Sequence, residues 1–546
     1  MNRIEAKNDS YPRVSLRRDS DVALHDESIV HHLQNSAGPL PAAGHLRRFR
    51  PRFRARADCL YPFLTVIVSF LIRSVPEIMS SPFPIGFDTM NYYVPALLDG
   101  RWTVADLTSP DPYCVVQLLT YQFLIHDPVL LVKVMGPLLN SALALAIYYY
   151  ARRCLRWSPP KASCGAVLCT SYFVALRISW EMYRQMLGTI FLFLALVSMT
   201  YSAKLKQRIG TMTFALLTAV SHEIPGLILI SVFVLKSATY LRRRSGHRAL
   251  WLPLAAIVTL VILLYHRYVP GSGLVLPVSI QGEFRAPALD IVGFYLYCYW
   301  MVIPIALVGV KHVKEFALRV WVVVCLAGSL LVFALPQGAA MWFRSAIFLV
   351  YPVMLWFVQG LTTTLDPQRL GYKAVAIKGV ALASLLLITS LSAIYLVTGP
   401  ENAFPLFGQY NAYLVYLPSS MVQNSVPIDD ARQVVRALEW VQTQGNSTLV
   451  IPKPFWGYGK LILTGTTVSV IYLDFPTLPV SPRDQNNEVL LKRVMDDIVQ
   501  GAPTNGRADV RFIWWISGTG WYGVTWLDPR FHLIFAAGDI AIYSYQ

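Results

Sequence analysis

Charged side chains in this sequence stand in short polar interruptions between long apolar runs. The first interruption, residues 82–100, places Asp88 beside Gly86 and close to Tyr92 and Tyr93. An isolated carboxylate at the end of a membrane span is costly to desolvate, so it usually faces water, a partner or a substrate. Asp88 is therefore the first candidate for a chemical centre. The alternatives are a solvated loop acid or a cap for the following helix.

Later interruptions carry further charged groups. These are Glu181 with Arg184, His222 with Glu223, Glu283 with Arg285, and Arg344. A carboxylate can take the proton from an attacking hydroxyl, and an arginine can hold a phosphate through two parallel hydrogen bonds. A departing phosphate needs cationic stabilisation, from arginine or from a metal. If these segments open on one face, they predict transfer of a group from a lipid-phosphate carrier.

The predicted site has two sets of residues. The catalytic candidates are Asp88, Glu181 and Glu223, and the candidates for binding the substrate or the lipid phosphate are Arg184, His222, Arg344 and Tyr92. Each has an alternative interpretation. Glu181 and Arg184 are three residues apart and could pair on a helix end, His222 and Glu223 could cap helices, and Arg344 could be an interfacial anchor. Glu283 and Arg285 are interpreted as ordinary loop charges.

Composition indicates a membrane protein. Hydrophobic residues make up 55% of the 546 residues and charged residues only 14%, far from the values of soluble domains. The net charge of +16 comes from basic residues that lie between the apolar runs, as topology signals do, so we set nucleic acid aside as a partner. The seven Cys include no CxxC pair, which argues against a disulfide framework or a Cys-based zinc site.

The apolar runs predict about eleven transmembrane helices, judged against the roughly 20 residues that a helix needs to cross a bilayer. Lys and Arg clusters place the N-terminus in the cytoplasm and the C-terminus outside. The expected spans are 59–77, 128–150, 163–177, 186–203, 210–220, 224–241, 249–267, 291–310, 317–335, 345–362 and 374–397. Residues 177–185 are expected to form a short loop, and residues 221–223 the tip of a broken hairpin.

Three regions follow from this pattern. Residues 1–57 are expected to be a disordered basic cytoplasmic tail, residues 58–397 the polytopic membrane domain with a first outer loop at 78–127, and residues 398–546 a soluble extracytoplasmic domain of α/β or α+β type. Within the last region we predict a helix capped by Asp429 and Asp430 and closed by Gly445, another helix at 485–499, and strands at 447–451, 461–473, 510–516 and 540–545.

Several motifs together resemble those of polytopic GT-C-type glycosyltransferases. They are Gly86-Phe-Asp88-Thr-Met-Asn-Tyr92, Ser179-Trp-Glu-Met-Tyr-Arg184, Ser221-His-Glu223, a Trp-x-Arg that ends at Arg344, and a C-terminal outer domain with an Asp-capped helix. The resemblance covers residues 59–546. It implies transfer of a sugar from a polyprenyl-phosphate carrier to an acceptor on the outer face, usually with inversion. It also implies Asp88 as general base or metal-side carboxylate and Arg344 as the contact to the lipid phosphate.

Two other functions stay open. One is oligosaccharyltransferase-like transfer of a lipid-linked glycan to protein, although Trp514-Trp515-Ile-Ser-Gly lacks the acid and the tyrosine of the matching signature and is interpreted as a core strand. The other is a transporter or a non-catalytic scaffold; a transporter would show paired broken helices in two repeated halves. The expected partners are a polyprenyl-phosphate-sugar donor, a glycan, lipid or protein acceptor, and membrane lipids. No nucleotide cofactor is expected, the role of a divalent metal is left open, and a prokaryotic cell membrane is the expected location.

Overall fold

The computed structural model describes residues 50–98, 112–200, 205–242, 251–268, 288–330, 342–366, 372–397, 426, 428–473, 510–515 and 531–545. The chain divides into two compact units, residues 1–57 and 58–546. Apart from the first residues of helix α1, the described residues belong to the second unit. The predicted tail therefore lies almost entirely outside the described residues, as does the helix predicted at 485–499.

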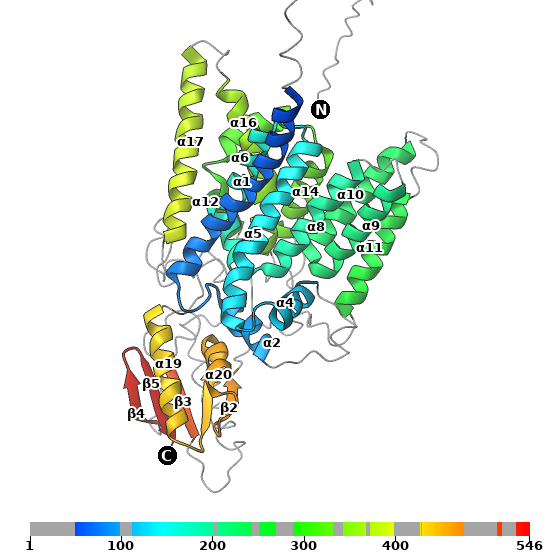
Figure 1. Ribbon diagram of the computed structural model, residues 1–546. Helices are drawn as coiled ribbons and strands as arrows, with labels where there is room; N and C mark the ends of the chain where they lie inside the picture. Colours follow the sequence, from blue (N-terminus) through cyan, green and yellow to red (C-terminus); the bar gives the residue numbers. More distant parts are fainter. Residues whose placement is uncertain are drawn as a thin grey trace, which may run out of the picture. The chain divides into compact units, whose positions relative to one another are not determined.

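Helices pack side by side in the part of the chain before residue 398 (Figure 1). They are α1 (Arg50–Met79), α5 (Pro128–Arg153), α6 (Pro159–Ser171), α7 (Phe173–Glu181), α8 (Tyr183–Thr200), α9 (Leu205–Ser221), α10 (Glu223–Arg242), α11 (Trp251–Tyr268), α12 (Ala288–Tyr299), α13 (Ile303–His312), α14 (Phe316–Leu330), α15 (Trp342–Phe348), α16 (Val350–Thr364) and α17 (Tyr372–Val397). Between α1 and α5 lie the π-helix η1 (Thr89–Tyr93), α2 (Val94–Leu98) and α4 (Pro112–Phe123).

Six of these helical stretches are long and apolar enough to cross a membrane, so the chain is a multi-pass membrane protein. They are Cys59–Met79, Pro128–Arg153, Tyr183–Thr200, Glu223–Tyr240, Trp342–Thr364 and Val375–Val397. Two bent pairs, α6 with α7 and α12 with α13, raise the number to eight if each pair is one span. Among the described residues, the number of spans is therefore lower than the eleven that were predicted. The apolar helices around 251–265 and 316–330 are shorter than a full span, and the first arm of the predicted hairpin does not qualify.

Local sequence sets the ends of α5. The Asp127 carboxylate accepts hydrogen bonds from the backbone N–H groups of Val129 and Leu130 at 2.8 and 3.1 Å. Pro128 occupies the first turn, where no N–H is needed, and Arg152 and Arg153 lie in the last turn, where cations interact favourably with the helix dipole.

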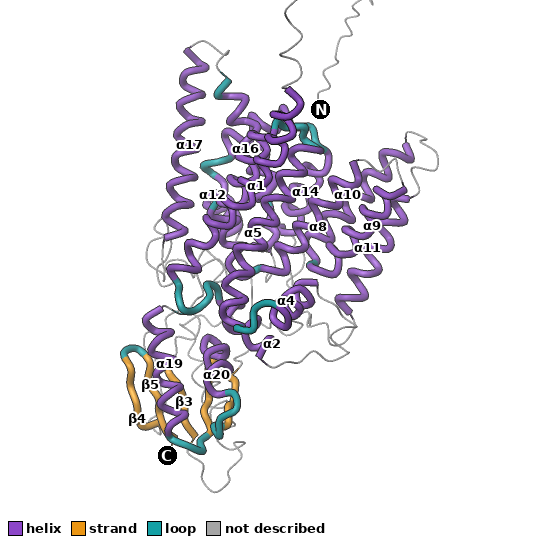
Figure 2. The backbone as a smooth tube through the Cα atoms, in the orientation of Figure 1, coloured by secondary structure: helices purple, strands orange, loops and turns teal. Residues whose placement is uncertain are grey.

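All described strands follow residue 447 and form one mixed sheet (Figure 2). The strands are β1 (Thr448–Pro452), β2 (Ser469–Leu473), β3 (Val510–Trp515), β4 (Phe531–Ala537) and β5 (Ile540–Tyr545), in the order β2-β1-β3-β5-β4. β1 pairs parallel with β2 and β3, whereas β5 pairs antiparallel with β3 and β4. Helix α20 (Trp456–Leu463) connects β1 to β2, and α19 (Ile428–Thr443) packs against β4 and β5. The prediction of a helical membrane protein with a small C-terminal sheet domain is confirmed.

Two predictions about the helices before residue 398 have different outcomes. The loop predicted at 177–185 is wrong, because α7 continues to Glu181 and α8 begins at Tyr183, with a break only at Met182. The break predicted at 221–223 is confirmed, since α9 ends at Ser221 and α10 begins at Glu223. A run with buried charges can therefore stay helical when those charges have partners inside the protein.

Predictions for the C-terminal region also differ in outcome. The strands at 447–451, 510–516 and 540–545 correspond to β1, β3 and β5, although residue 516 is outside the described residues. The strand predicted at 461–473 is wrong in its first part, where α20 extends to Leu463, and β4 was missed. Asp429 and Asp430 lie in the first turn of α19 rather than at its cap, because the helix begins at Ile428.

A close contact joins α20 to η1, the helix that follows Asp88. The backbone N–H of Gly457 donates to Asn91 Oδ1 at 3.0 Å, and the Asn91 side-chain amide donates to the Phe87 carbonyl at 3.2 Å. A Cβ atom on Gly457 would lie 1.7 Å from the Met90 carbonyl oxygen, so this position accepts only glycine. Tyr458 and Phe83 pack edge to face beside it, with ring centroids 4.9 Å apart. We refer to this contact as the α20–η1 contact.

We expect Gly457→Ala to destabilise the protein by about 1–3 kcal/mol, the usual cost of forcing extra volume into a packed site. The added methyl group must push α20 away from η1. Thermal unfolding of the purified protein in detergent measures the effect. Gly379→Ala is the matched control: Gly379 is also helical, but a Cβ there meets nothing within 4 Å. Equal unfolding temperatures for the two variants would contradict the prediction.

Candidate functional site

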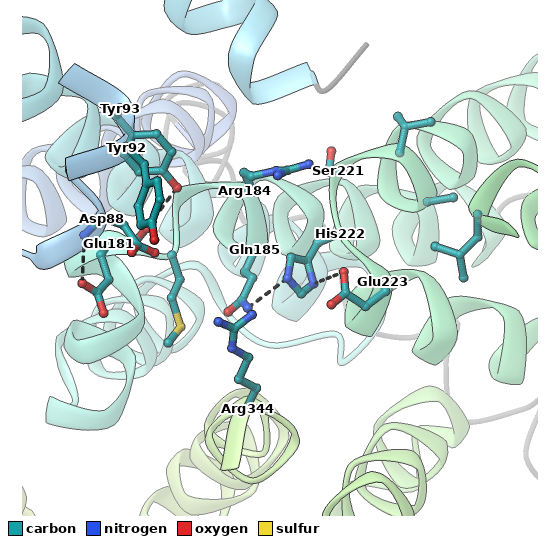
Figure 3. A pocket seen from close by; sticks show the side chains of 14 residues that line it. Asp88, Tyr92, Tyr93, Glu181, Arg184, Gln185, Ser221, His222, Glu223 and Arg344 are labelled. Atoms are coloured by element: carbon teal, nitrogen blue, oxygen red, sulfur yellow. Dashed lines mark hydrogen bonds and ion pairs between the residues drawn. The ribbon is translucent and has the colours of Figure 1, made fainter. Parts of the chain in front are cut away.

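One cavity of about 330 Å³ is lined by all seven side chains predicted for the site (Figure 3). They come from six places: the segment before η1, η1 itself, the junction between the end of α7 and the start of α8, the break between α9 and α10, the start of α10, and α15. The seven are Asp88, Tyr92, Glu181, Arg184, His222, Glu223 and Arg344. Glu283 and Arg285 lie outside the described residues.

Asp88 lies at the entrance to η1 and is half-buried. It precedes the helix in the capping position, but its side chain makes no capping hydrogen bond, so the cap that we considered as an alternative is absent. Gly86 sets the path of the chain just before it, with φ of +100°, in the region that favours glycine. A Cβ on Gly86 would lie 2.8 Å from the Trp180 carbonyl oxygen, so the loop touches the backbone of α7.

Glu181 holds this loop from the end of α7. Its Oε2 accepts hydrogen bonds from the backbone N–H groups of Phe87 at 2.8 Å and of Asp88 at 3.4 Å. Its Oε1 accepts from the Arg177 guanidinium, four residues earlier on the same helix. The Tyr93 hydroxyl donates to the Glu181 backbone carbonyl at 3.1 Å. Both carboxylate oxygens of Glu181 therefore have partners within the protein.

His222 stands in the break between α9 and α10, between two polar neighbours. Its Nε2 lies 2.9 Å from Gln185 Nε2, and its Nδ1 lies 3.5 Å from Glu223 Oε2 (Figure 3). The backbone N–H of Ile224 approaches Nδ1 at 3.3 Å. Gln185, from α8, thus joins the cavity wall to the imidazole. The predicted hairpin tip places one titratable ring and one carboxylate side by side at the cavity.

Arg344 enters the cavity from α15 and points toward Gln185 and His222 (Figure 3). Its Nε is buried and has no hydrogen-bond partner among the described residues, and none of the ion pairs found in that part of the chain includes it. The guanidinium carbon lies 6.0 Å from the ring centroid of Phe343. Together with Arg184, Arg344 gives the cavity two cationic side chains, as an anionic ligand requires.

Sequence reasoning missed several residues that build this site. Gln185 lines the cavity and Arg177 binds Glu181, and Tyr93 and Ser221, which were noted in the sequence but given no role, also line it. A second buried pair, Arg73 with Glu77, lies near the end of α1. The signal that could have found the two pairs is the spacing Arg-x-x-x-Glu, which occurs twice in apolar surroundings, as Arg-Ser-Val-Pro-Glu and Arg-Ile-Ser-Trp-Glu.

Metal ligation has only partial support in the site. Among the described residues, no group of three or more His, Cys, Asp or Glu side chains is arranged to hold a metal ion. His222 and Glu223 are two such side chains at the cavity, and the two carboxylate oxygens of Glu181 are engaged by other groups. The site's acidic and cationic groups can still act directly on a substrate as base and as anion-binding donors.

The fold is similar to that of ArnT from Cupriavidus metallidurans in two crystal structures, one bound to undecaprenyl phosphate and one in the apo state. The sequence identities are 10% and 11%, and each comparison covers 89% of this chain and 97% of the ArnT chain, with a TM-score of 0.48. No protein-family model matches the chain, and no curated protein sequence matches it. The chemistry of the cavity is therefore argued from this chain's own residues.

Proposed function

We propose that this protein is a membrane glycosyltransferase that transfers a sugar from a polyprenyl-phosphate-linked donor to an acceptor. Asp88 is the general base, and Arg344 binds the phosphate of the lipid carrier. Arg184 and His222 assist in binding the phosphate or the sugar, Glu223 is a second acid or base, and Tyr92 lies at the edge where a sugar ring can pack. Transfer takes place on the extracytoplasmic face of a prokaryotic cell membrane.

The proposed reaction is one displacement at the anomeric carbon of the sugar. The Asp88 carboxylate takes the proton of the acceptor hydroxyl while that oxygen forms the new bond to the carbon. The bond between this carbon and the phosphate oxygen breaks, and its electron pair stays on the polyprenyl phosphate. Arg344 stabilises the charge that develops there, through a guanidinium that can form two parallel hydrogen bonds to a phosphate. The configuration at the sugar is inverted.

One observation carries this proposal: Asp88 and Arg344, far apart in the sequence, line the same cavity. A base alone, or a phosphate-binding group alone, would be compatible with many other functions. Their presence in one cavity supports the prediction that the separate polar interruptions act together. The cavity walls at Ala219, Val220 and Leu263 are apolar, which suits a ligand that carries a lipid chain.

The test is transfer by the purified full-length protein in lipid nanodiscs, offered a panel of polyprenyl-phosphate sugars. Release of free polyprenyl phosphate reports cleavage of the donor, and labelled glycan, lipid or peptide acceptors report transfer. Nucleotide sugars serve as control donors, since we expect none to be used. Transfer to peptide alone would favour the oligosaccharyltransferase-like alternative. A folded protein that neither binds polyprenyl phosphate nor cleaves any donor would contradict the proposal.

A transporter is the second candidate, because the structure contains two bent helix pairs. The α6–α7 pair bends by 65° and the α12–α13 pair by 77°. The hydroxyl of Tyr172, at the first bend, donates to the carbonyl of Cys298 near the second, at 2.5 Å. Only the first pair reaches the cavity, through Glu181, and no residue of α12 or α13 lines it. A flux assay in proteoliposomes separates the two functions, and net sugar flux without donor cleavage would favour transport.

A further inference from the structure

Two buried ion pairs with the same spacing lie beside the Asp88 loop. On α1, Arg73 Nη2 lies 2.8 Å from Glu77 Oε1, and on α7, Arg177 pairs with Glu181. The four side chains are at most 6% exposed. Arg73 also donates from Nε and Nη2 to the Ser179 carbonyl, at 3.2 and 3.0 Å, which ties α1 to the helix that carries the second pair.

The second carboxylate oxygen of each glutamate accepts hydrogen bonds from the backbone of the loop. Glu77 Oε2 accepts from the backbone N–H of Ile85 at 3.2 Å, and Glu181 Oε2 accepts from Phe87 and Asp88 at 2.8 and 3.4 Å. Three of the four N–H groups from Ile85 to Asp88 are therefore held by two carboxylates that come from different helices. The loop is fixed on both sides of Gly86.

Stability alone does not explain these pairs. Burying two charges costs several kcal/mol in desolvation, and apolar side chains of similar volume often replace a buried pair without loss of stability. An apolar pair could not accept hydrogen bonds from the loop. Gly136 on α5 leaves room for one pair, since a Cβ there would lie 2.8 Å from Arg73 Nη2.

We propose that Arg73–Glu77 and Arg177–Glu181 are positioning residues: each arginine orients its glutamate, and the glutamates hold the backbone on either side of Gly86 so that Asp88 faces the cavity. This inference rests on the proposed function for its catalytic readout. It assigns Glu181 the task of placing the base, whereas Asp88 itself contacts the acceptor. Glu77 is not among the described residues that line the cavity, and it also acts by holding the loop that carries Asp88.

The experiment compares Glu181→Gln and Glu77→Gln with the wild-type protein, each full-length in lipid nanodiscs. Glutamine keeps the shape but offers one acceptor oxygen in place of two. We expect kcat to fall about 10- to 100-fold, because a displacement of about 1 Å at a reacting group can cost about 10²-fold. KM for the polyprenyl-phosphate sugar and Kd for polyprenyl phosphate should stay within about twofold, since Arg344 is on a different helix. Glu439→Gln, an exposed position on α19, is the matched control.

Backbone hydrogen exchange tests the same inference without catalysis. Peptides that cover residues 83–93 should exchange faster in Glu181→Gln than in wild type or in Glu439→Gln. If Glu181→Gln does not fold, the apolar double variant Arg177→Met/Glu181→Leu replaces it, and we expect the same faster exchange with near wild-type thermal stability. Unchanged kcat together with unchanged exchange would overturn the inference. If wild-type protein transfers no sugar, the proposed function fails, and exchange alone decides whether the glutamates hold the loop.

Discussion

Asp88→Asn is expected to lower sugar transfer by at least about 100-fold while the protein stays folded. A positioned general base contributes typically 10²–10⁴-fold, and an amide of the same size cannot take the proton from the acceptor hydroxyl. The side chain makes no capping hydrogen bond to the helix that follows, so the substitution removes no such bond. Initial rates with a polyprenyl-phosphate sugar measure the loss, and thermal unfolding verifies the fold.

Asp429→Asn is the matched control for this change. Asp429 is on α19, its side chain is 86% exposed, and its only ion pair found in the described residues is a loose contact of 3.4 Å with Arg432. We expect wild-type rates from this variant. Transfer by Asp88→Asn at the wild-type rate would remove Asp88 as the base. Equal losses in both variants would mean that the assay reports general damage rather than chemistry.

Arg344→Gln is expected to weaken binding of polyprenyl phosphate by about 10- to 100-fold, which corresponds to the roughly 1.5–3 kcal/mol of a hydrogen bond to a charged group. The Arg344 Nε has no hydrogen-bond partner among the described residues, so a phosphate would supply the missing acceptor. Arg344→Lys keeps the charge but loses the planar fork, and we expect it to bind between wild type and Arg344→Gln. Titration of the purified protein with polyprenyl phosphate measures all three.

Arg432→Gln provides the control for removal of an arginine. Arg432 lies on α19 with a side chain 57% exposed, so its loss should leave binding unchanged. Raising the salt concentration should weaken wild-type binding less than the loss of Arg344 does, because a partly buried charge is screened less than an exposed one. Wild-type affinity in Arg344→Gln would assign the phosphate to another group, with Arg184 as the next candidate.

The sequence predicted elements best where one rule decided the outcome. Apolar runs of full span length became α5, α10 and α17, and the polar tip at His222 became a helix break. The loop predicted at the end of α7 was wrong because it was inferred from polarity alone. Arg177 and Glu181 form an ion pair inside the protein, and the helix continues through both residues. Strand β4 was missed although Asp528-Pro529, a turn signal, stands just before it in the sequence.

The charged site residues could be identified from the sequence, but the residues that hold them in place could not. A charge that interrupts an apolar run is visible in the sequence whatever it contacts, as with Asp88, His222 and Arg344. The partner of such a charge depends on which helices meet, and this depends on packing across the whole bundle. Glu77 and Ile85 are eight residues apart, but Glu181 and Phe87 are ninety-four apart. Only the second contact required the tertiary structure, and it is the one that holds the loop next to Asp88.

The α20–η1 contact connects the C-terminal sheet region to the backbone next to Asp88. From Gly457 through Asn91 to the Phe87 carbonyl, an unbroken hydrogen-bonded path ends one residue from Asp88. Replacing this region with one from another protein would therefore remove a contact that supports the segment before η1, and a molecule that displaces α20 would disturb the proposed base without entering the cavity.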